Sequence, residues 1–176
     1  MNIVLIGYRG TGKSVVGQIL AKRLNMDYVG MDANVVQRAG MPIPQIVEKF
    51  GWPGFRDIET EEALDLAGRD NMVIDSGGGV IERPENIRAL AKNGTLFWLK
   101  ASVDTIVKRI AGDDQRPALT EGKSFTEEVA EVLEARRSKY QSAAQYEIDT
   151  DMLTPEQVAE KIISLYSLTS DYILSP

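Results

Sequence analysis

The segment at residues 7–14 constrains the fold of this chain more than any other part of the sequence. It reads GYRGTGKS and matches the pattern G-x-x-x-x-G-K-[ST] at every fixed position. An apolar run at residues 2–6 precedes it and an amphipathic stretch at 13–24 follows it, so the segment joins an expected strand to an expected helix. These are the features of a P-loop, whose glycines let backbone N–H groups turn toward phosphate oxygens. The sequence therefore predicts a nucleoside triphosphate site.

The residues of this P-loop have separate expected roles. Lys13 is expected to reach the β- and γ-phosphates, and the Ser14 hydroxyl is expected to ligate Mg²⁺. The positive end of the following helix adds to the attraction for phosphate. A dinucleotide fold is disfavoured, because the segment lacks the G-x-G with which that fingerprint begins. The expected nucleotide-binding residues of the loop are Gly10, Thr11, Gly12, Lys13, Ser14 and Val15.

The composition narrows the chemistry. The 176 residues include no histidine and no cysteine, which excludes Ser-His-Asp catalysis, thiolate chemistry and histidine-ligated metals. A required metal is therefore expected to be a hard, oxygen-bound cation such as Mg²⁺. The net charge of −6 argues against a nucleic-acid partner, and no apolar run reaches the ~18 residues of a membrane span. We expect a cytoplasmic protein with no membrane partner, whose N-terminus forms a first strand and not a signal peptide.

Short apolar runs alternate with longer amphipathic segments, which predicts an α/β fold with a central parallel sheet flanked by helices. Residues 1–176 are expected to form one domain. Residues 112–124 are the best loop candidate, and residues 168–176 are expected to form a loosely held tail. We predict strands at 2–6, 28–29, 72–75, 95–99 and 146–148, and helices at 13–24, 44–50, 54–67, 84–92, 103–111, 125–144 and 155–166.

A second glycine-rich segment follows the strand predicted at residues 72–75. Asp75 comes after an apolar pair, as a Walker B carboxylate does, and is placed to hold Mg²⁺ directly or through water. Ser76 is placed to hold a metal-bound water. The glycines at 77–79 are costly in conformational entropy, which is justified where a ligand approaches the backbone closely. Because ligands bind at the carboxyl ends of strands in open α/β sheets, we favour a functional segment over a simple turn.

Further short motifs lie in order along the chain after the P-loop. They are Asp32-Ala33-Asn34, Phe55-Arg56-Asp57-Ile58-Glu59, Gly77-Gly78-Gly79, Arg116-Pro117-Ala118-Leu119 and Arg136-Arg137-Ser138-Lys139-Tyr140. Together they resemble the motifs Asp-x-Asp, Phe-Arg-x-x-Glu, Gly-Gly-Gly, Arg-Pro-x-Leu and Arg-x-x-x-Tyr of the shikimate kinases. The resemblance implies a P-loop nucleoside monophosphate kinase-like three-layer fold, with a substrate-binding region at residues 32–60 and a mobile lid at 112–124. It also implies ATP-dependent phosphorylation of the 3-hydroxyl of shikimate.

The resemblance assigns the acceptor substrate to residues from several of these motifs. Guanidinium forks and backbone N–H groups hold a small carboxylate well, which suits Arg56, Arg136 and Gly78. Glu59 lies three residues after Arg56, so on a helix it shares a face with Arg56 and can orient it or accept from a substrate hydroxyl. The expected substrate-binding residues are Asp32, Asn34, Arg56, Glu59, Gly77, Gly78, Gly79 and Arg136.

The resemblance also implies roles in catalysis, nucleotide binding and metal binding. The expected catalytic residues are Lys13, Asp32 and Arg116. Arg116 is expected to close over the phosphates with the lid, where it binds the nucleotide, stabilises transition-state charge and excludes water. Arg109 is expected to stack on adenine, although an arginine at a helix C-terminus is also favourable for the dipole alone. The expected Mg²⁺ ligands are Ser14, Asp32 and Asp75.

Asn34 departs from the family pattern. The resemblance implies that the second aspartate of Asp-x-Asp contacts the substrate hydroxyls and helps to remove a proton, which an amide does not do at neutral pH. If positioning dominates phosphoryl transfer, Asp32 can accept the proton late or through water on Mg²⁺; otherwise the chain is slow or prefers another polyol. Trp52, where the family usually has glutamate, is expected to alter the wall of the substrate pocket.

Three functions stay open at this point. The leading one is a shikimate kinase that acts as a monomer on ATP and shikimate. The second is a related kinase for gluconate or another polyol. The third is a nucleotide-binding regulatory module with little catalysis. Turnover with shikimate and with a panel of polyols distinguishes the three.

Overall fold

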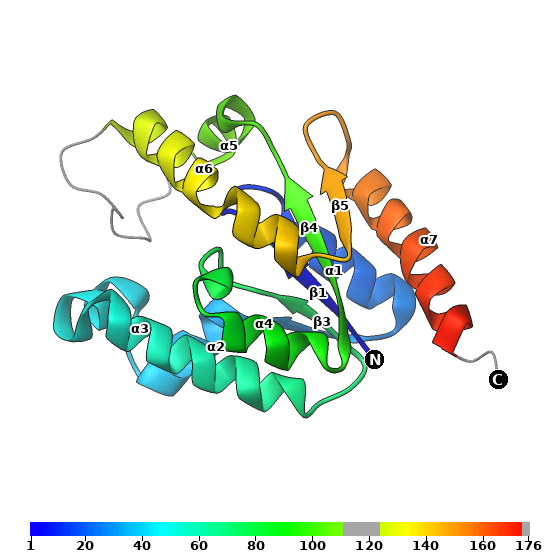
Figure 1. Ribbon diagram of the computed structural model, residues 1–176, viewed down its shortest axis with the longest axis horizontal. Coiled ribbons are helices and arrows are strands. Elements are labelled where there is room, and N and C mark those ends of the chain that lie inside the picture. Colours follow the sequence, from blue (N-terminus) through cyan, green and yellow to red (C-terminus); the bar gives the residue numbers. More distant parts are fainter. Residues whose placement is uncertain (111–123, 174–176) are drawn as a thin grey trace.

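The sheet at the centre of the molecule confirms the predicted fold class. The computed structural model describes residues 1–110 and 124–173 (Figure 1). Its strands form one five-stranded sheet in the order β2-β3-β1-β4-β5, and neighbouring strands run parallel. The strands are β1 (Asn2–Ile6), β2 (Asp27–Gly30), β3 (Met72–Asp75), β4 (Gly94–Lys100) and β5 (Tyr146–Asp149).

Local chemistry explains where several helices begin and end. One helix starts at a capping box, in which the Ser124 side chain accepts from the Glu127 N–H and the Glu127 side chain accepts from the Ser124 N–H. Asn25 and Gly40, both in the left-handed conformation, end two others. The helices are α1 (Lys13–Leu24), α2 (Met31–Ala39), α3 (Ile43–Ala67), α4 (Pro84–Ala91), α5 (Val103–Ile110), α6 (Phe125–Ala143) and α7 (Pro155–Ile173), with a short 3₁₀ helix, η1 (Val80–Glu82).

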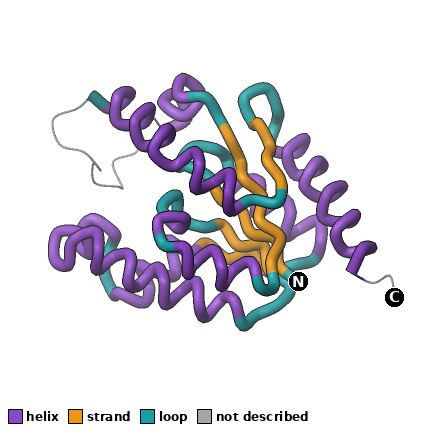
Figure 2. Tube along the Cα trace, in the orientation of Figure 1, coloured by secondary structure: helices purple, strands orange, loops and turns teal. Residues whose placement is uncertain are grey.

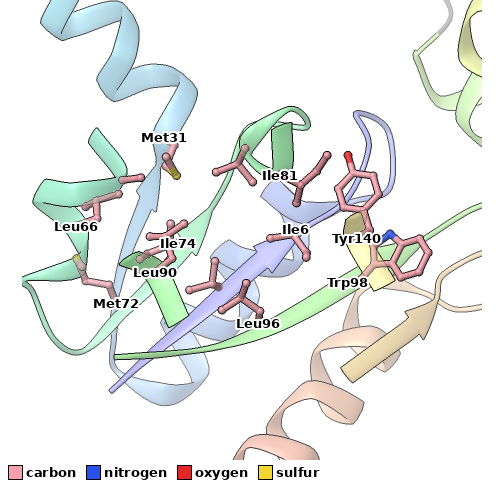
Figure 3. Packing of buried hydrophobic residues seen from close by; sticks show 13 residues of the cluster. Ile6, Met31, Leu66, Met72, Ile74, Ile81, Leu90, Leu96, Trp98 and Tyr140 are labelled. Atoms are coloured by element: carbon pink, nitrogen blue, oxygen red, sulfur yellow. The ribbon is translucent and has the colours of Figure 1, made fainter. Parts of the chain in front are cut away.

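Helices cover both faces of the sheet, which gives three layers (Figure 2). Val4 and Ile6 of β1 belong to one core cluster, and the residues that alternate with them belong to the other. The first cluster joins the sheet to α3, α4 and α6, and there the rings of Trp98 and Tyr140 stack with centroids 5.5 Å apart (Figure 3). The second cluster joins the sheet to α1 and α7. Burial on both faces explains why the three inner strands, β1, β3 and β4, are largely apolar.

Three elements differ from their predictions. α2 is absent from the prediction, because it begins directly after β2 and buries only Met31 and Val35, which is too little to show a helical period. The two helices predicted between residues 44 and 67 form one element, α3, interrupted by Gly51 with a φ of 68°. The loosely held C-terminal tail is wrong as far as the structure describes it, because α7 continues to Ile173.

Two other expectations concern the lid and the membrane. The lid predicted at residues 112–124 lies outside the described residues, apart from Ser124, and Arg116 lies outside them too. None of the helices in the described part of the chain is long and apolar enough to cross a membrane.

The carboxyl ends of β1, β2 and β3 bring the predicted motifs together. Asp75, at the end of β3, is paired in register with Gly30 of β2 on one side and with Leu5 of β1 on the other. The P-loop follows β1, α2 follows β2, and the glycine triplet follows β3. Since ligands bind at this edge of an open α/β sheet, the fold places all three segments where a site is expected.

Candidate active site

The P-loop backbone adopts a conformation that requires its glycines. Gly7, Gly10 and Gly12 have φ values of 142°, 79° and 96°, in the left-handed region that residues with a Cβ rarely adopt. A Cβ on Gly7 would also lie 2.4 Å from the Leu99 carbonyl oxygen. α1 begins at Lys13, directly after the loop, so the N–H groups of its first turn face the same space. The loop is therefore shaped in advance to hold phosphate.

A pocket beside the loop collects most of the predicted nucleotide-binding residues. Lys13 is buried, and its Nζ donates to the carbonyl oxygens of Gly7 at 2.8 Å and Tyr8 at 3.0 Å. The Thr11 hydroxyl is also buried and donates to the Tyr8 carbonyl at 2.8 Å, so its side chain supports the loop from inside. The residues that line the pocket are Arg9, Gly10, Gly12, Lys13, Ser14, Val15, Asp32, Asp75 and Ser76.

The three residues predicted to bind Mg²⁺, Ser14, Asp32 and Asp75, meet in this pocket. The Ser14 hydroxyl donates to Asp75 Oδ2 at 2.6 Å, and the Tyr28 hydroxyl donates to the same oxygen at 3.0 Å. Burial, and then the nearby Asp75 carboxylate, raises the pKa of Tyr28 to about 12, so the hydroxyl stays protonated at neutral pH. Two carboxylates and a hydroxyl suit Mg²⁺, which is usually held by one or two carboxylates together with substrate phosphates. Within the described residues there is no group of three or more His, Cys, Asp or Glu that could hold a metal alone.

A second cavity adjoins the first and collects the predicted acceptor residues. Asp32 and Arg9 line both spaces, so the two cavities meet at these side chains. The walls of the second cavity come from the P-loop, α2, α3, the glycine triplet and α6. The predicted residues that line it are Asp32, Arg56, Glu59, Gly77, Gly78, Gly79 and Arg136.

Close approach of side chains explains the outer two glycines of the triplet. A Cβ on Gly77 would lie 2.7 Å from Asp32 Oδ1 and 2.9 Å from Glu59 Oε1. A Cβ on Gly79 would lie 2.0 Å from Arg56 Nη2, inside the guanidinium group. Neither glycine has a left-handed φ. The triplet is therefore needed for space, and the groups that fill the space are the charged side chains predicted to bind the acceptor.

The central glycine anchors α6 to the cavity. The Gly78 carbonyl accepts hydrogen bonds from Arg136 Nη1, at 3.4 Å, and from the buried Tyr140 hydroxyl. Arg136 Nε also donates to Glu82 Oε1 at 2.6 Å, and Lys139 pairs with the same carboxylate. These contacts leave the Arg136 side chain lining the cavity while its position is fixed from two sides.

Arg56 and Glu59 form a buried ion pair at the wall of the cavity. Arg56 Nη1 donates to Glu59 Oε2 at 2.7 Å, and the Glu59 side chain is only 1% exposed. The Arg56 guanidinium also lies 5.5 Å from the Trp52 ring centroid and 5.0 Å from that of Phe55. Burial raises the pKa of Glu59, and Arg56 opposes this shift. Glu59 therefore orients Arg56 at a cost in desolvation.

The stability of the fold is expected to depend on pH through Glu59. Its folded-state pKa is raised above the ordinary value of 4.5, so the native state holds this proton more tightly than the unfolded chain does. Protonation of Glu59 therefore stabilises the native state fully below pH 4.5, and this contribution to the unfolding free energy is lost as the pH rises through the folded-state pKa. Glutamine does not titrate. The unfolding free energy of Glu59→Gln is therefore expected to increase relative to that of wild type as the pH rises from 4.5 through the folded-state pKa of Glu59. Urea unfolding across the range measures the trend, and the exposed Glu48→Gln on the same helix is the control. A difference that stays constant with pH would contradict the raised pKa.

Arg109 lies at an apolar groove on the other side of the P-loop. Its Nη1 donates to the Gly10 carbonyl at 3.2 Å and to the Thr150 hydroxyl at 3.1 Å, and its Nη2 donates to the Thr150 carbonyl at 3.1 Å. The groove is also lined by Val15, Leu153 and other apolar side chains. A guanidinium plane held at the edge of an apolar groove beside a P-loop suits the flat face of a purine.

Asn34 is the predicted acceptor residue that does not line the cavity. Its Nδ2 donates to Glu62 Oε1 at 2.6 Å, on a different surface shared with Arg38 and Asp65. The unpredicted helix α2 explains this: two residues along a helix correspond to a rotation of about 200°, so Asp32 and Asn34 point to opposite sides. Asp32 thus lies on the acceptor side, and Asn34 belongs to the contact between α2 and α3.

Asn34→Asp is expected to lower stability without raising turnover. It would replace an amide donor by a carboxylate at 2.6 Å from Glu62, which is buried. The lost hydrogen bond and the added repulsion are expected to cost about 1–3 kcal/mol of unfolding free energy. Urea unfolding measures the loss, and Asn34→Ala separates loss of the donor from gain of charge. A higher turnover number in Asn34→Asp would place position 34 back in the acceptor site.

Arg9 lines the acceptor cavity, although the sequence did not predict it as a substrate-binding residue. Its Nη2 lies 3.7 Å from the buried Glu128 Oε1, and its guanidinium lies 5.4 Å from the Phe125 ring centroid. Arg9 stands at a variable P-loop position, so the motif itself gives no signal for it. The remaining unpredicted lining residues are Tyr8, Ile43 and Phe55; Trp52 lines the wall as predicted.

Comparison with known proteins identifies the family to which this site belongs. Residues 9–167 match the family model described as shikimate kinase. The chain belongs to the shikimate kinase family. A shikimate kinase of Thermodesulfovibrio yellowstonii is 43% identical over 170 residues, which cover 97% of each protein. One of Caldicellulosiruptor bescii is 39% identical over 165 residues, 94% of this chain and 95% of its own. Members of the family are phosphotransferases that act on a hydroxyl group with ATP as the donor.

Solved structures agree with the family and with the fold. A shikimate kinase from Acinetobacter baumannii in complex with shikimate has a TM-score of 0.90 and 32% identity, covering 96% of this chain and 93% of that one. A gluconokinase from Sinorhizobium meliloti has a TM-score of 0.61 at 20% identity, which shows a shared fold alone. The predicted nucleoside monophosphate kinase-like architecture is therefore confirmed.

Proposed function

We propose that this chain transfers the γ-phosphoryl group of ATP to the 3-hydroxyl of shikimate. The observation that supports this most is the cavity beside the P-loop, which is lined by both Arg56 and Arg136 and which meets the phosphate pocket at Asp32. Shikimate carries one carboxylate and three hydroxyls, so guanidinium groups and a carboxylate suit its two ends. The related enzyme from A. baumannii was solved with shikimate bound.

On the acceptor side, Arg56 and Arg136 hold the substrate carboxylate, and Glu59 keeps Arg56 in place. Asp32 accepts a hydrogen bond from the reacting hydroxyl and takes its proton late in the transfer, a role that fits its place between the two cavities. The glycines at 77–79 keep the wall thin enough for these groups to converge. Asn34 has no direct role, because it faces Glu62.

On the donor side, the backbone of the P-loop from Gly10 to Val15 surrounds the phosphates, and Lys13 moves from its carbonyl partners to the β- and γ-phosphates. Arg109 and the groove beside it take the adenine. Bound Mg²⁺ would neutralise charge on the β- and γ-phosphate oxygens, and Ser14, Asp75 and Asp32 would hold it. The protein positions donor and acceptor, since phosphoryl transfer needs little covalent help from side chains.

The resemblance alone supports the remaining roles. Arg116 would close over the phosphates with the lid at residues 112–124, and residues 32–60 would form the acceptor-binding region of a single domain, 1–176. We infer that the enzyme works as a monomer in the cytoplasm, without a nucleic-acid or membrane partner, in keeping with its net charge of −6.

A turnover assay tests the proposal. Purified protein with ATP and Mg²⁺ is expected to form ADP only when shikimate is added, while gluconate and other polyols give background rates. ADP formation with a polyol and not with shikimate would replace the proposal by a polyol kinase. ATP binding with no productive acceptor would replace it by a nucleotide-binding module.

A further inference from the structure

The Asp75 carboxylate, which lines the pocket beside the P-loop, accepts a hydrogen bond from Tyr28 of the neighbouring strand β2. Asp75 ends β3, and both hydrogen bonds to it recorded among the described residues fall on one oxygen, Oδ2. Ser14 of the P-loop supplies the first at 2.6 Å, and Tyr28 of β2 supplies the second at 3.0 Å. Two donors on one oxygen fix the rotation of the carboxylate, so that the other oxygen, Oδ1, has a defined direction.

The position of Tyr28 depends on a glycine in α1. A Cβ on Gly17 would lie 2.9 Å from Tyr28 Cε2 and 3.3 Å from its Cδ2, so only glycine lets the ring lie against α1 in this way. The ring also packs against the second core cluster, and its hydroxyl reaches Asp75 at the phosphate-side edge of the sheet. Packing against α1 therefore fixes the Tyr28 ring, and the ring holds the hydroxyl in place as a hydrogen-bond donor to Asp75.

We propose that the Tyr28 hydroxyl is a positioning residue for Mg²⁺–nucleotide binding, because it orients the Asp75 carboxylate toward the ion. The proposal rests on the proposed function for the identity of the ligand, and it adds a residue outside the P-loop to the donor site. Tyr28 acts through Asp75 and does not line the pocket beside the loop.

Position 30 provides an internal check on this arrangement. Gly30 pairs in register with Asp75 across β2 and β3, and it lies on the same face of β2 as Tyr28, two residues away. The atom nearest to a Cβ built on Gly30 is the Tyr28 hydroxyl oxygen, at 3.7 Å, which is ordinary contact. A carboxylate introduced at position 30 would therefore fit and would meet the same hydroxyl. We therefore expect a carboxylate at position 30 to take over part of the role of Asp75.

The test measures how much Mg²⁺ strengthens ADP binding, by calorimetric titration with and without the metal. Tyr28→Phe keeps the ring and removes only the hydroxyl. We expect the Mg²⁺-dependent gain in ADP affinity to fall by about three- to tenfold, while ADP affinity in EDTA changes by less than about twofold. Tyr166→Phe is the control. It also removes one hydrogen bond donated by a tyrosine hydroxyl, to the Met1 carbonyl, and Tyr166 does not line the pocket beside the P-loop.

The second arm moves the carboxylate. Asp75→Ser is expected to lower the Mg²⁺-dependent gain further, and Gly30→Asp in the Asp75→Ser background is expected to restore part of it. An unchanged gain in folded Tyr28→Phe, or in folded Asp75→Ser, would overturn the proposal. Because the readout needs no shikimate, an enzyme that binds Mg²⁺–ADP normally but fails to phosphorylate shikimate would count against the proposed function alone.

Discussion

Lys13→Ala is expected to lower the turnover number with ATP and shikimate by about 10²- to 10³-fold, the loss typical of removing one preorganised group that stabilises transition-state charge. The structure places Nζ within the loop, 2.8 Å from the Gly7 carbonyl and 3.0 Å from the Tyr8 carbonyl. It can exchange these neutral acceptors for phosphate oxygens without leaving the loop. The ammonium group of Lys13 then stabilises the negative charge that builds on the phosphates.

The loss should be specific to this lysine. Lys22 lies on the same helix, α1, and is exposed, so Lys22→Ala is the matched control and is expected to turn over within about twofold of wild type. Circular dichroism checks that both variants are folded. A Lys13→Ala enzyme that keeps more than about a tenth of wild-type turnover would remove Lys13 from the catalytic role that the P-loop assigns to it.

Gly79→Ala is expected to weaken shikimate binding by about tenfold to a hundredfold and to leave the Michaelis constant for ATP nearly unchanged. The new Cβ would lie 2.0 Å from Arg56 Nη2, so the guanidinium must move. Because the guanidinium pairs with the buried Glu59, its displacement also costs stability, and it takes the fork away from the substrate carboxylate. A hydrogen bond to a charged group contributes about 1.5–3 kcal/mol, which corresponds to the expected range.

Gly68→Ala is the matched control for this substitution. Gly68 follows α3, has ordinary helical backbone angles, and a Cβ there would lie 3.7 Å from the nearest atom, the Asp65 carbonyl oxygen. Steady-state kinetics with each substrate varied in turn measures both Michaelis constants. Equal effects of Gly79→Ala on shikimate and ATP, or no effect on either, would mean that Arg56 does not bind the acceptor.

Much of the arrangement around the P-loop could be predicted from sequence for the described residues, because the loop itself is one continuous segment. The P-loop fixes its own backbone through glycines at set spacings, and the strand before it and the helix after it follow from hydrophobic periodicity. The position of Asp75 beside the P-loop was predictable as well, since a carboxylate after a buried apolar pair at the end of a strand resembles a Walker B position. Parallel strands then bring Asp75 to the P-loop without further information.

The residue types on the acceptor side could be predicted from sequence, but the directions in which their side chains point could not. The Asp-x-Asp comparison assumes that Asp32 and Asn34 face the same way, as they would in an extended segment. The helix α2 starts at Met31 and turns them apart, and it is too short and too weakly apolar to be seen in the sequence. Asn34, a weak point of the expected site, is therefore a contact to Glu62, and the acceptor side keeps its carboxylate at Asp32.

Arg9 and Tyr28 could not be predicted, for a related reason. Each acts through neighbours that are distant in sequence: Arg9 through Glu128 of α6, and Tyr28 through Asp75 of β3. A single sequence records such pairs only as isolated residues at variable positions. The glycine triplet was predicted to let a ligand approach the backbone closely, whereas in the structure the groups that approach Gly77 and Gly79 are protein side chains.

Identification of the product tests the central claim most directly. Protein, ATP, Mg²⁺ and shikimate are incubated together, and the product is analysed by phosphorus and proton NMR. The account predicts one phosphate ester at the 3-hydroxyl of shikimate, formed in equal amount to ADP. ADP formed without a shikimate ester, or an ester at another hydroxyl, would contradict the placement of the acceptor between Arg56, Arg136 and Asp32.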